Sequence, residues 1–143
     1  MHDPKPAALG LLSLVLLLAG CGSTSVVPAT GAATAGSKVT GSIAYRERIA
    51  LPPTATIIVQ LVEVSRADAP AVLITEQIIT AAGRQVPFEF SLAYDASRIQ
   101  PSHAYAVQVR IEDGGRLLFS SDTVNRVITR DAPTRLDMVV RRI

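Results

Sequence analysis

The sequence predicts an all-β protein, a single antiparallel β-sandwich of about seven strands that follows a signal peptide and a flexible linker. Three observations lead to this fold class. Apolar and polar residues alternate with a period of two from residue 38 onward. Gly, Pro and Asp interrupt these runs at regular intervals. No segment after the leader shows the 3.6-residue period of a helix beyond one short turn at residues 96–100. Residues 38–143 are therefore expected to form one domain with one hydrophobic core.

Residues 1–20 are predicted to be a lipoprotein signal peptide. Residues 7–18 form a Leu-rich apolar run, shorter than the roughly 20 residues that a membrane-spanning helix needs. The run ends in Leu-Ala-Gly-Cys at residues 18–21, which resembles the lipobox of lipoprotein signal peptidase. We therefore expect cleavage before Cys21 and a lipid on its sulfur. The alternative is an ordinary signal peptide followed by an incidental thiol.

The cysteine content and the residues after Cys21 support the lipid anchor. Cys21 is the single cysteine, and in an exported chain it would otherwise be a reactive thiol without an intramolecular partner. The next residue is Gly22 and not Asp, which resembles the signal for sorting to the cell outer membrane, with the domain facing the periplasm. Residues 22–37 are Ser, Thr, Gly, Ala, Pro and Val without a charge, so residues 21–37 are predicted to be the lipidated N-terminus and a flexible tether.

Seven segments have the composition and period of β-strands. They are residues 39–45, 55–64, 72–80, 86–92, 105–112, 116–121 and 135–141. Residues 55–64 are nearly continuously apolar, which is typical of a central strand, and residues 72–80 are similar. Pro87 has no N–H group, so it belongs at a strand start or on an edge strand. Asp113-Gly114-Gly115 predicts a hairpin turn.

A tyrosine motif refines the sandwich prediction. Ile99-x-Pro101 is followed by Tyr105-x-Val107, and this order resembles the tyrosine corner of immunoglobulin-like sandwiches, in which the hydroxyl bonds an upstream backbone group. The alternative is that Tyr105 is a plain, half-buried tyrosine. The sequence therefore predicts an immunoglobulin-like sandwich without deciding the role of this side chain.

The sequence offers no set of residues for catalysis, a metal or a cofactor. The net charge is +2 and stays so when the leader is removed, because Lys5 and Asp3 leave together; no basic run indicates nucleic acid. After processing, His103 is the single histidine, and we expect it in a solvent-exposed loop. Zinc and copper sites need several His or Cys ligands. Nothing singles out an acid pair among the scattered Glu63, Asp68, Glu76, Glu89, Asp95, Glu112, Asp113, Asp122, Asp131 and Asp137.

Two short segments are candidates for binding. Leu51-Pro52-Pro53 is expected to be exposed between the first two strands, where it either presents a rigid extended surface or, as we favour, caps a strand. Arg141-Arg142 either binds phosphates of lipid headgroups or forms a solvated chain end.

Several motifs together resemble the YbaY/YscW-type lipoprotein family. The first is Gly41-x-Ile43-x-Tyr45-Arg46-Glu47-Arg48, and the most specific are Leu51-Pro52-Pro53 and Gln85-Val86-Pro87. The match covers residues 41–140. The resemblance implies a β-sandwich and a place at the outer membrane. The best-described branch of the family is the chaperone, or pilotin, of type III secretion secretins. No family motif marks contact with a secretin, so we assign no binding residues.

Two functions follow as hypotheses. The first is a non-catalytic binding or chaperone module, pilotin-like, that is held in the membrane by lipid on Cys21 and binds an envelope protein such as a secretin by strand addition or through a hydrophobic groove. Edge strands near Pro87 are its candidate surface. The alternative is a structural or accessory cell-surface lipoprotein that contacts exported glycan and has no dedicated protein client.

Overall fold

The computed structural model describes residues 36–143. Apart from one short 3-10 helix, the regular elements of this part of the chain are strands. In chain order they are β1 (Lys38–Ala44), β2 (Thr56–Glu63), β3 (Val72–Thr80), β4 (Phe88–Ala93), η1 (Ala96–Arg98), β5 (Tyr105–Asp113), β6 (Arg116–Ser120), β7 (Asn125–Val127), β8 (Arg135–Val139) and β9 (Arg141–Arg142). Among these residues there is no helix long and apolar enough to cross a membrane.

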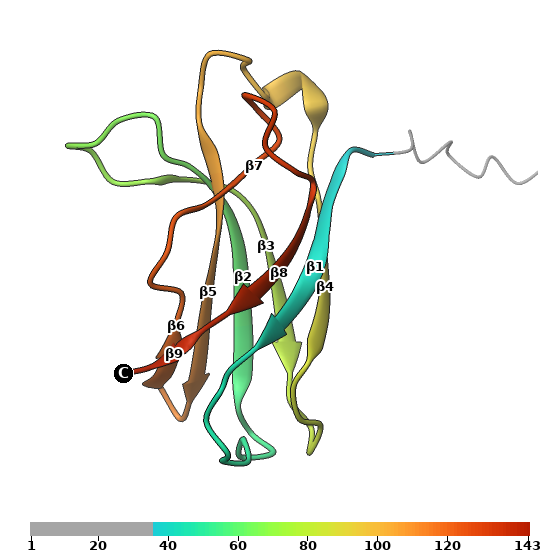
Figure 1. Cartoon of the computed structure of the whole chain (residues 1–143), viewed down its shortest axis with the longest axis vertical. Coiled ribbons are helices and arrows are strands. Elements are labelled where there is room, and N and C mark those ends of the chain that lie inside the picture. The colour runs from blue at the N-terminus through green and yellow to red at the C-terminus, as the bar shows by residue number, and fades with distance from the viewer. Residues whose placement is uncertain (1–35) are drawn as a thin grey trace, which may run out of the picture. The chain divides into compact units, whose positions relative to one another are not determined.

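The strands form two sheets, as Figure 1 shows. The three-stranded sheet has the order β4-β1-β8, in which β1 pairs antiparallel with β4 and parallel with β8. The larger sheet has the order β3-β2-β5-β6-β9, and β7 pairs with β5. Each pair in the larger sheet is antiparallel. The predicted sandwich is therefore confirmed, with one parallel pair in the smaller sheet.

The core lies between the inward faces of the two sheets. Strand β2 places every second residue inward, and Ile57, Val59 and Leu61 are fully buried. They share one aliphatic and aromatic cluster with Phe88 and Phe90 of β4, which alternate with exposed neighbours. Burial of apolar surface of this kind is the main stabilising term of a small domain. No charged or polar residue of the described chain is buried.

One glycine is required for the pairing of β1 with β8. Gly41 lies opposite Phe90 on one side and Leu136 on the other. A Cβ atom built on Gly41 would collide with the backbone carbonyl oxygen of Leu136 and would lie 2.8 Å from Cε1 of Phe90. Because a backbone carbonyl cannot move aside as a side chain can, only glycine fits here.

The seven predicted strands are all present, but the predicted last strand, residues 135–141, is divided into β8 and the start of β9, and β7 was not predicted. Strands β7 and β9 have three and two residues, too few to show a period of two. The predicted turn at residues 96–100 is η1, which Asp95 caps by accepting hydrogen bonds from the N–H and hydroxyl of Ser97. These hydrogen bonds lower the pKa of Asp95. The predicted hairpin turn is confirmed by positive φ angles of 55° and 79° at Gly114 and Gly115.

The prediction for residues 72–80 is right about the strand and wrong about its place. The continuous apolar run suggested a central strand like β2, but β3 is the edge of the larger sheet. Its side chains Val72, Leu73 and Ile78 remain 54%, 48% and 61% exposed. A continuous apolar run shows that both faces of a strand carry apolar side chains. It does not show whether a neighbouring strand or sheet covers them.

Candidate binding surface

Strands β3 and β4 form an open side of the sandwich. Each is the terminal strand of its sheet, and the two lie next to each other. Strand β4 begins directly after Pro87, so the predicted edge strand near Pro87 is confirmed. One hydrogen bond joins the two edges, from the Ser91 N–H to Oε1 of Gln77 at 2.8 Å. We call β3 and β4 together the open side.

Between Thr75 and Thr80, the backbone of β3 has free hydrogen-bonding groups at every second residue. A register shift interrupts this alternation nearer the start of the strand, where Leu61 pairs with Thr75 and Val62 pairs with Leu73. In an antiparallel ladder the residues point alternately toward the partner strand and away from it. The Ala81 N–H donates to the Ala55 carbonyl, so the register of β3 on β2 turns the backbone of Gln77 and Ile79 toward β2. The N–H and C=O groups of Glu76 and Ile78 consequently point away from the sheet. A natural edge usually protects such groups with charges, Pro or a bulge.

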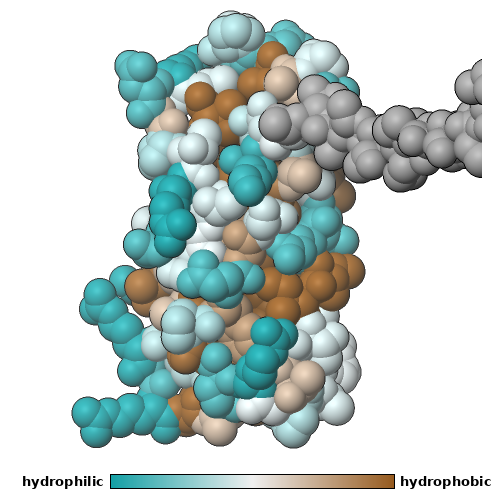
Figure 2. Space-filling model, turned by 90° about the vertical axis from the view of Figure 1, so that its right-hand side faces the viewer, coloured by the Kyte–Doolittle hydropathy of each residue, from teal (hydrophilic) through white to brown (hydrophobic). Residues whose placement is uncertain are grey.

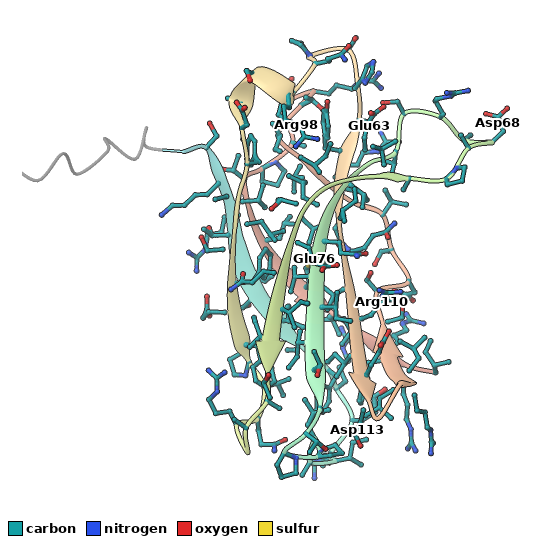
Figure 3. All side chains as sticks on the ribbon, turned by 180° about the vertical axis from the view of Figure 1, so that it is seen from behind. Glu63, Asp68, Glu76, Arg98, Arg110 and Asp113 are labelled. Atoms are coloured by element: carbon teal, nitrogen blue, oxygen red, sulfur yellow. The ribbon has the colours of Figure 1, made fainter. Side chains whose placement is uncertain are left out.

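The side chains of β3 leave most of this edge apolar. Glu76 is the one charged residue in the strand, and its Oε2 accepts a hydrogen bond from Nε2 of Gln60 at 2.6 Å. Figure 3 shows Glu76 midway along the larger sheet. Figure 2 looks onto the open side and shows apolar side chains gathered at the margin formed by β3. A long edge with this composition favours contact with another strand.

The opposite side of the sandwich is closed by the chain itself. After β8 the chain crosses to the larger sheet, where β9 pairs with β6. The Val140 N–H donates to the Ala44 carbonyl at 2.9 Å, and the Ile143 N–H donates to the Leu118 carbonyl at 3.0 Å. These bonds satisfy backbone groups on both sheets. We call this the closed side.

The predicted Pro-rich segment is part of the fold. Leu51 is only 4% exposed and belongs to the core, so the expectation of a fully exposed segment is wrong for this residue. The Ala55 N–H donates to the Pro52 carbonyl at 3.0 Å in the turn that leads into β2. The favoured interpretation, that the segment caps a strand, is confirmed.

The two most specific family motifs meet at this turn. The side chain of Gln85 accepts a hydrogen bond from the Leu51 N–H at 2.8 Å and donates to the Leu51 carbonyl at 3.3 Å. Tyr45 donates its hydroxyl proton to the Ile49 carbonyl at 2.7 Å and stacks on Phe119 with ring centroids 4.5 Å apart. Burial, and then the charge of Glu47, raise the pKa of Tyr45. These motifs therefore hold the fold together and do not present a ligand site.

At the other end of the sandwich lie Tyr105, the first residue of β5, and His103 in the loop before it. Tyr105 is 1% exposed, and its hydroxyl accepts a hydrogen bond from the Gln100 N–H at 3.0 Å. The tyrosine corner is confirmed, and the interpretation as a half-buried tyrosine is wrong. His103 lies with Nδ1 2.9 Å from Oε1 of Glu63, and its side chain is 33% exposed. The expectation of a solvent-exposed loop histidine is therefore corrected to a half-buried, paired one.

The C-terminal arginines line a hollow that mixes both signs of charge. They form β9, and Nε of Arg141 lies 2.8 Å from Oδ2 of Asp122. The hollow has a volume of about 450 Å³ and also contacts Arg46 and Glu47. Because carboxylates and guanidinium groups alternate around it, it does not select a phosphate by charge. The choice between a phosphate contact and a solvated end stays open for Arg141 and Arg142.

The remaining candidate residues do not form a reactive cluster. Figure 3 shows Glu63, Glu76, Asp68 and Asp113 at separate places along the molecule. In residues 36–143 no group of three His, Cys, Asp or Glu side chains has the spacing to hold a metal ion. Cys21, the predicted lipidation site, lies outside the described residues, and its modification stays a prediction.

Three comparisons identify the relatives of this chain. The family described as "Type III secretion system lipoprotein chaperone (YscW)" matches residues 34–140. An uncharacterized lipoprotein of Escherichia coli (strain K12), YbaY, is 30% identical over 142 residues, which cover 90% of this chain and 74% of that protein. The structure of an alternative pilotin from the type II secretion system of Vibrio cholerae has a TM-score of 0.73 and 48% identity, and covers 75% of this chain and 96% of its own. The chain thus belongs to the YscW family of lipoprotein chaperones.

Proposed function

We propose that this protein is a lipoprotein of the cell outer membrane that acts as a non-catalytic, pilotin-like chaperone for another envelope protein. Lipid on Cys21 would hold it in the membrane, with the β-sandwich in the periplasm. Its candidate client is a secretin, the oligomeric outer-membrane protein of a secretion system. Membership in the YscW family supports the chaperone class, and the lipobox and Gly22 support the anchor and its destination.

The likeness to the Vibrio cholerae pilotin is the observation that carries this proposal. At 48% identity over nearly the whole of that chain and a TM-score of 0.73, the two proteins share their fold. The secretion systems named for the relatives differ, because the family is described for type III secretion and the pilotin for type II. The proposal therefore names a class of client and not one secretion system.

The non-catalytic part of the proposal rests on the chemistry of the described residues. The one histidine there pairs with Glu63 at the end of the sandwich. The polar groups that stand out are backbone groups on the edge of β3, which bind another backbone and do not transfer protons to a substrate. A protein that binds an extended segment would use these backbone groups to form hydrogen bonds with it.

The anchor is tested by Cys21→Ser, with Ser23→Ala as the matched control. Cells that express each form are grown with a fatty-acid analogue that can be labelled. We expect label on the wild type and on Ser23→Ala, and none on Cys21→Ser, which should fractionate with the soluble periplasmic proteins. Label that persists on Cys21→Ser would contradict the lipobox assignment.

The client is tested in the same two strains by locating their secretins. Loss of the anchor should leave a client secretin in the inner membrane or as monomers that do not resist detergent. The control Ser23→Ala should leave secretin assembly at the wild-type level. Normal assembly of every secretin in the Cys21→Ser strain would contradict the chaperone proposal and would favour an accessory lipoprotein, for which a glycan array is the next test.

A further inference from the structure

The edge of β3 has the chemistry of a strand-binding site. Antiparallel pairing with β2 leaves the N–H and C=O groups of Glu76 and Ile78 without a neighbouring strand. A helix has already satisfied its own backbone groups, so it cannot bond to such an edge, whereas an extended chain supplies donors and acceptors at the matching spacing of two residues. The geometry of the hydrogen-bonding groups therefore selects an extended occupant.

Two contacts define where the free part of the edge ends. Nη2 of Arg84 donates to the Thr80 carbonyl at 3.1 Å, which caps the edge after Ile78. Within β3, the side chain of Gln77 already accepts a hydrogen bond from the Ser91 N–H of the facing strand β4. The stretch that stays free is thus centred on Glu76 and Ile78. Val72 and Leu73 extend this stretch as exposed apolar contacts.

Side chains at the edge define the composition of the occupant. Ile78 is 61% exposed and offers apolar surface to a side chain on the added strand. Glu76 bonds to Gln60, and among the described residues no cation pairs with it. A Lys or Arg beside it on the added strand would gain a cross-strand ion pair. An alternating apolar and polar segment with one basic residue fits both positions.

The charge of β3 argues against a second copy as the occupant. Glu76 is the one charged residue of the strand, so the β3 strand of another copy has no basic side chain to place beside it. Pairing two copies would instead add a second carboxylate to the same pair of strands, and like charges on neighbouring strands are destabilising. A segment of another protein is under no such restriction.

We propose that β3 binds, by strand addition at its free edge, an extended segment of a different envelope protein that places a basic side chain beside Glu76. This inference rests on the proposed function for the existence of an envelope client. It adds the surface that is used and the conformation of the bound segment.

The test is crosslinking in living cells with the full, lipidated chain. A photoreactive benzoylphenylalanine replaces Leu73 or Ile78 on β3, and Val139 on β8 serves as the control because it is also apolar and is 43% exposed. Mass spectrometry then locates the crosslinked residues in the partner. We expect both β3 positions, and not the control, to mark one short segment of one protein, at residues an even number of positions apart.

Two further variants distinguish backbone pairing at the edge of β3 from nonspecific hydrophobic contact. Ile78→Pro removes an N–H that points away from β2, so it should keep the fold and lower the crosslinking yield from position 73 about tenfold. Glu76→Lys, which places a like charge beside the basic residue, should lower the yield more than Glu76→Gln. Melting curves test whether each variant is folded. If Ile78→Pro is not folded, the comparison of Glu76→Lys with Glu76→Gln decides whether the partner pairs with the edge of β3.

Each remaining outcome overturns the proposal. Crosslinks to a second copy would assign the edge to self-association, and marked residues spaced three or four apart would indicate a helix. A yield that neither Ile78→Pro nor Glu76→Lys lowers would exclude edge pairing. A secretin that crosslinks only at Val139 would overturn strand addition and leave the chaperone function standing, whereas a normal secretin in the Cys21→Ser strain would overturn the function itself.

Discussion

The open side and the closed side of this sandwich differ in how the backbone hydrogen-bonding groups at their edges are satisfied. On the closed side the chain passes from β8 to β9, and its own N–H groups at Val140 and Ile143 bond to both sheets. On the open side β3 and β4 end their sheets, and a single bond from the Ser91 N–H to Gln77 joins them. The difference indicates that the fold is complete without a partner at β3, so this edge is available for binding.

The largest effect is expected next to the closed side, at Gly41. Gly41→Ala should lower the free energy of unfolding by about 2–3 kcal/mol, because the new methyl group collides with the Leu136 carbonyl and separates β8 from β1. The measurement is urea unfolding followed by circular dichroism. As control, Gly83→Ala meets no atom within 4 Å, and its φ of 80° should cost only about 1 kcal/mol. Equal losses at both sites would refute the tight pairing of β1 with β8.

A smaller loss is expected where Gln85 ties two loops together at one end of the sandwich. Gln85→Ala leaves the Leu51 N–H without its acceptor, which should cost about 1–3 kcal/mol of unfolding free energy. Gln108→Ala on the exposed face of β5 is the matched control and should change stability by less than about 0.5 kcal/mol. If Gln85→Ala and Gln108→Ala unfold at the same urea concentration, the hydrogen bonds between Gln85 and Leu51 do not stabilise the protein in solution.

The tyrosine corner at the other end predicts a further, smaller loss. Tyr105→Phe keeps the buried ring and removes the acceptor of the Gln100 N–H, for a cost of about 1 kcal/mol. Tyr94→Phe on the half-buried neighbouring ring is the control and should be close to neutral. Thermal unfolding of the two variants measures the difference, and a neutral Tyr105→Phe would show that the hydrogen bond from the Gln100 N–H does not stabilise the fold.

The smallest effect on stability is expected on the open side. Ile78→Lys should change the unfolding free energy by less than about 0.5 kcal/mol, because its side chain is mostly in solvent. Ile57→Val, a milder change on the neighbouring strand, should cost about 1 kcal/mol because Ile57 is fully buried. A large loss for Ile78→Lys would mean that the edge is covered in the free protein, and the contrast between the two sides would fail.

Local patterns in the sequence were sufficient for most of the fold. The period of two located seven strands, and the spacing from Pro101 to Tyr105 located the corner, because both signals lie within one segment. Strand β7 was missed, and β9 was joined to β8 in one predicted strand, because both are too short to show a period and owe their pairing to β5 and β6. Gly41 was part of a recognised motif, but its contact with Leu136 joins residues far apart in the chain.

The candidate site was harder to predict for the same reason. Sequence reasoning named edge strands near Pro87, which β4 confirms. It predicted β3 as a strand but did not identify it as an edge strand, because its apolar composition resembles that of the central β2 and differs only in what lies beside it. The pairing of His103 with Glu63 also depends on a loop and the end of β2, which meet only in the folded protein. In each of these cases the role of a residue depends on what lies next to it in the folded protein, and not on its residue type.

Amide hydrogen exchange on the lipidated protein, alone and bound to its client, tests the central claim most directly. The account predicts that in the free protein the N–H groups of Glu76 and Ile78 exchange rapidly, while those of Gln77 and Ile79, bonded to β2, exchange slowly. The client should then protect Glu76 and Ile78 and leave Val140 on the closed side unchanged. Protection that appears elsewhere while Glu76 and Ile78 still exchange rapidly would contradict the assignment of β3 as the binding edge.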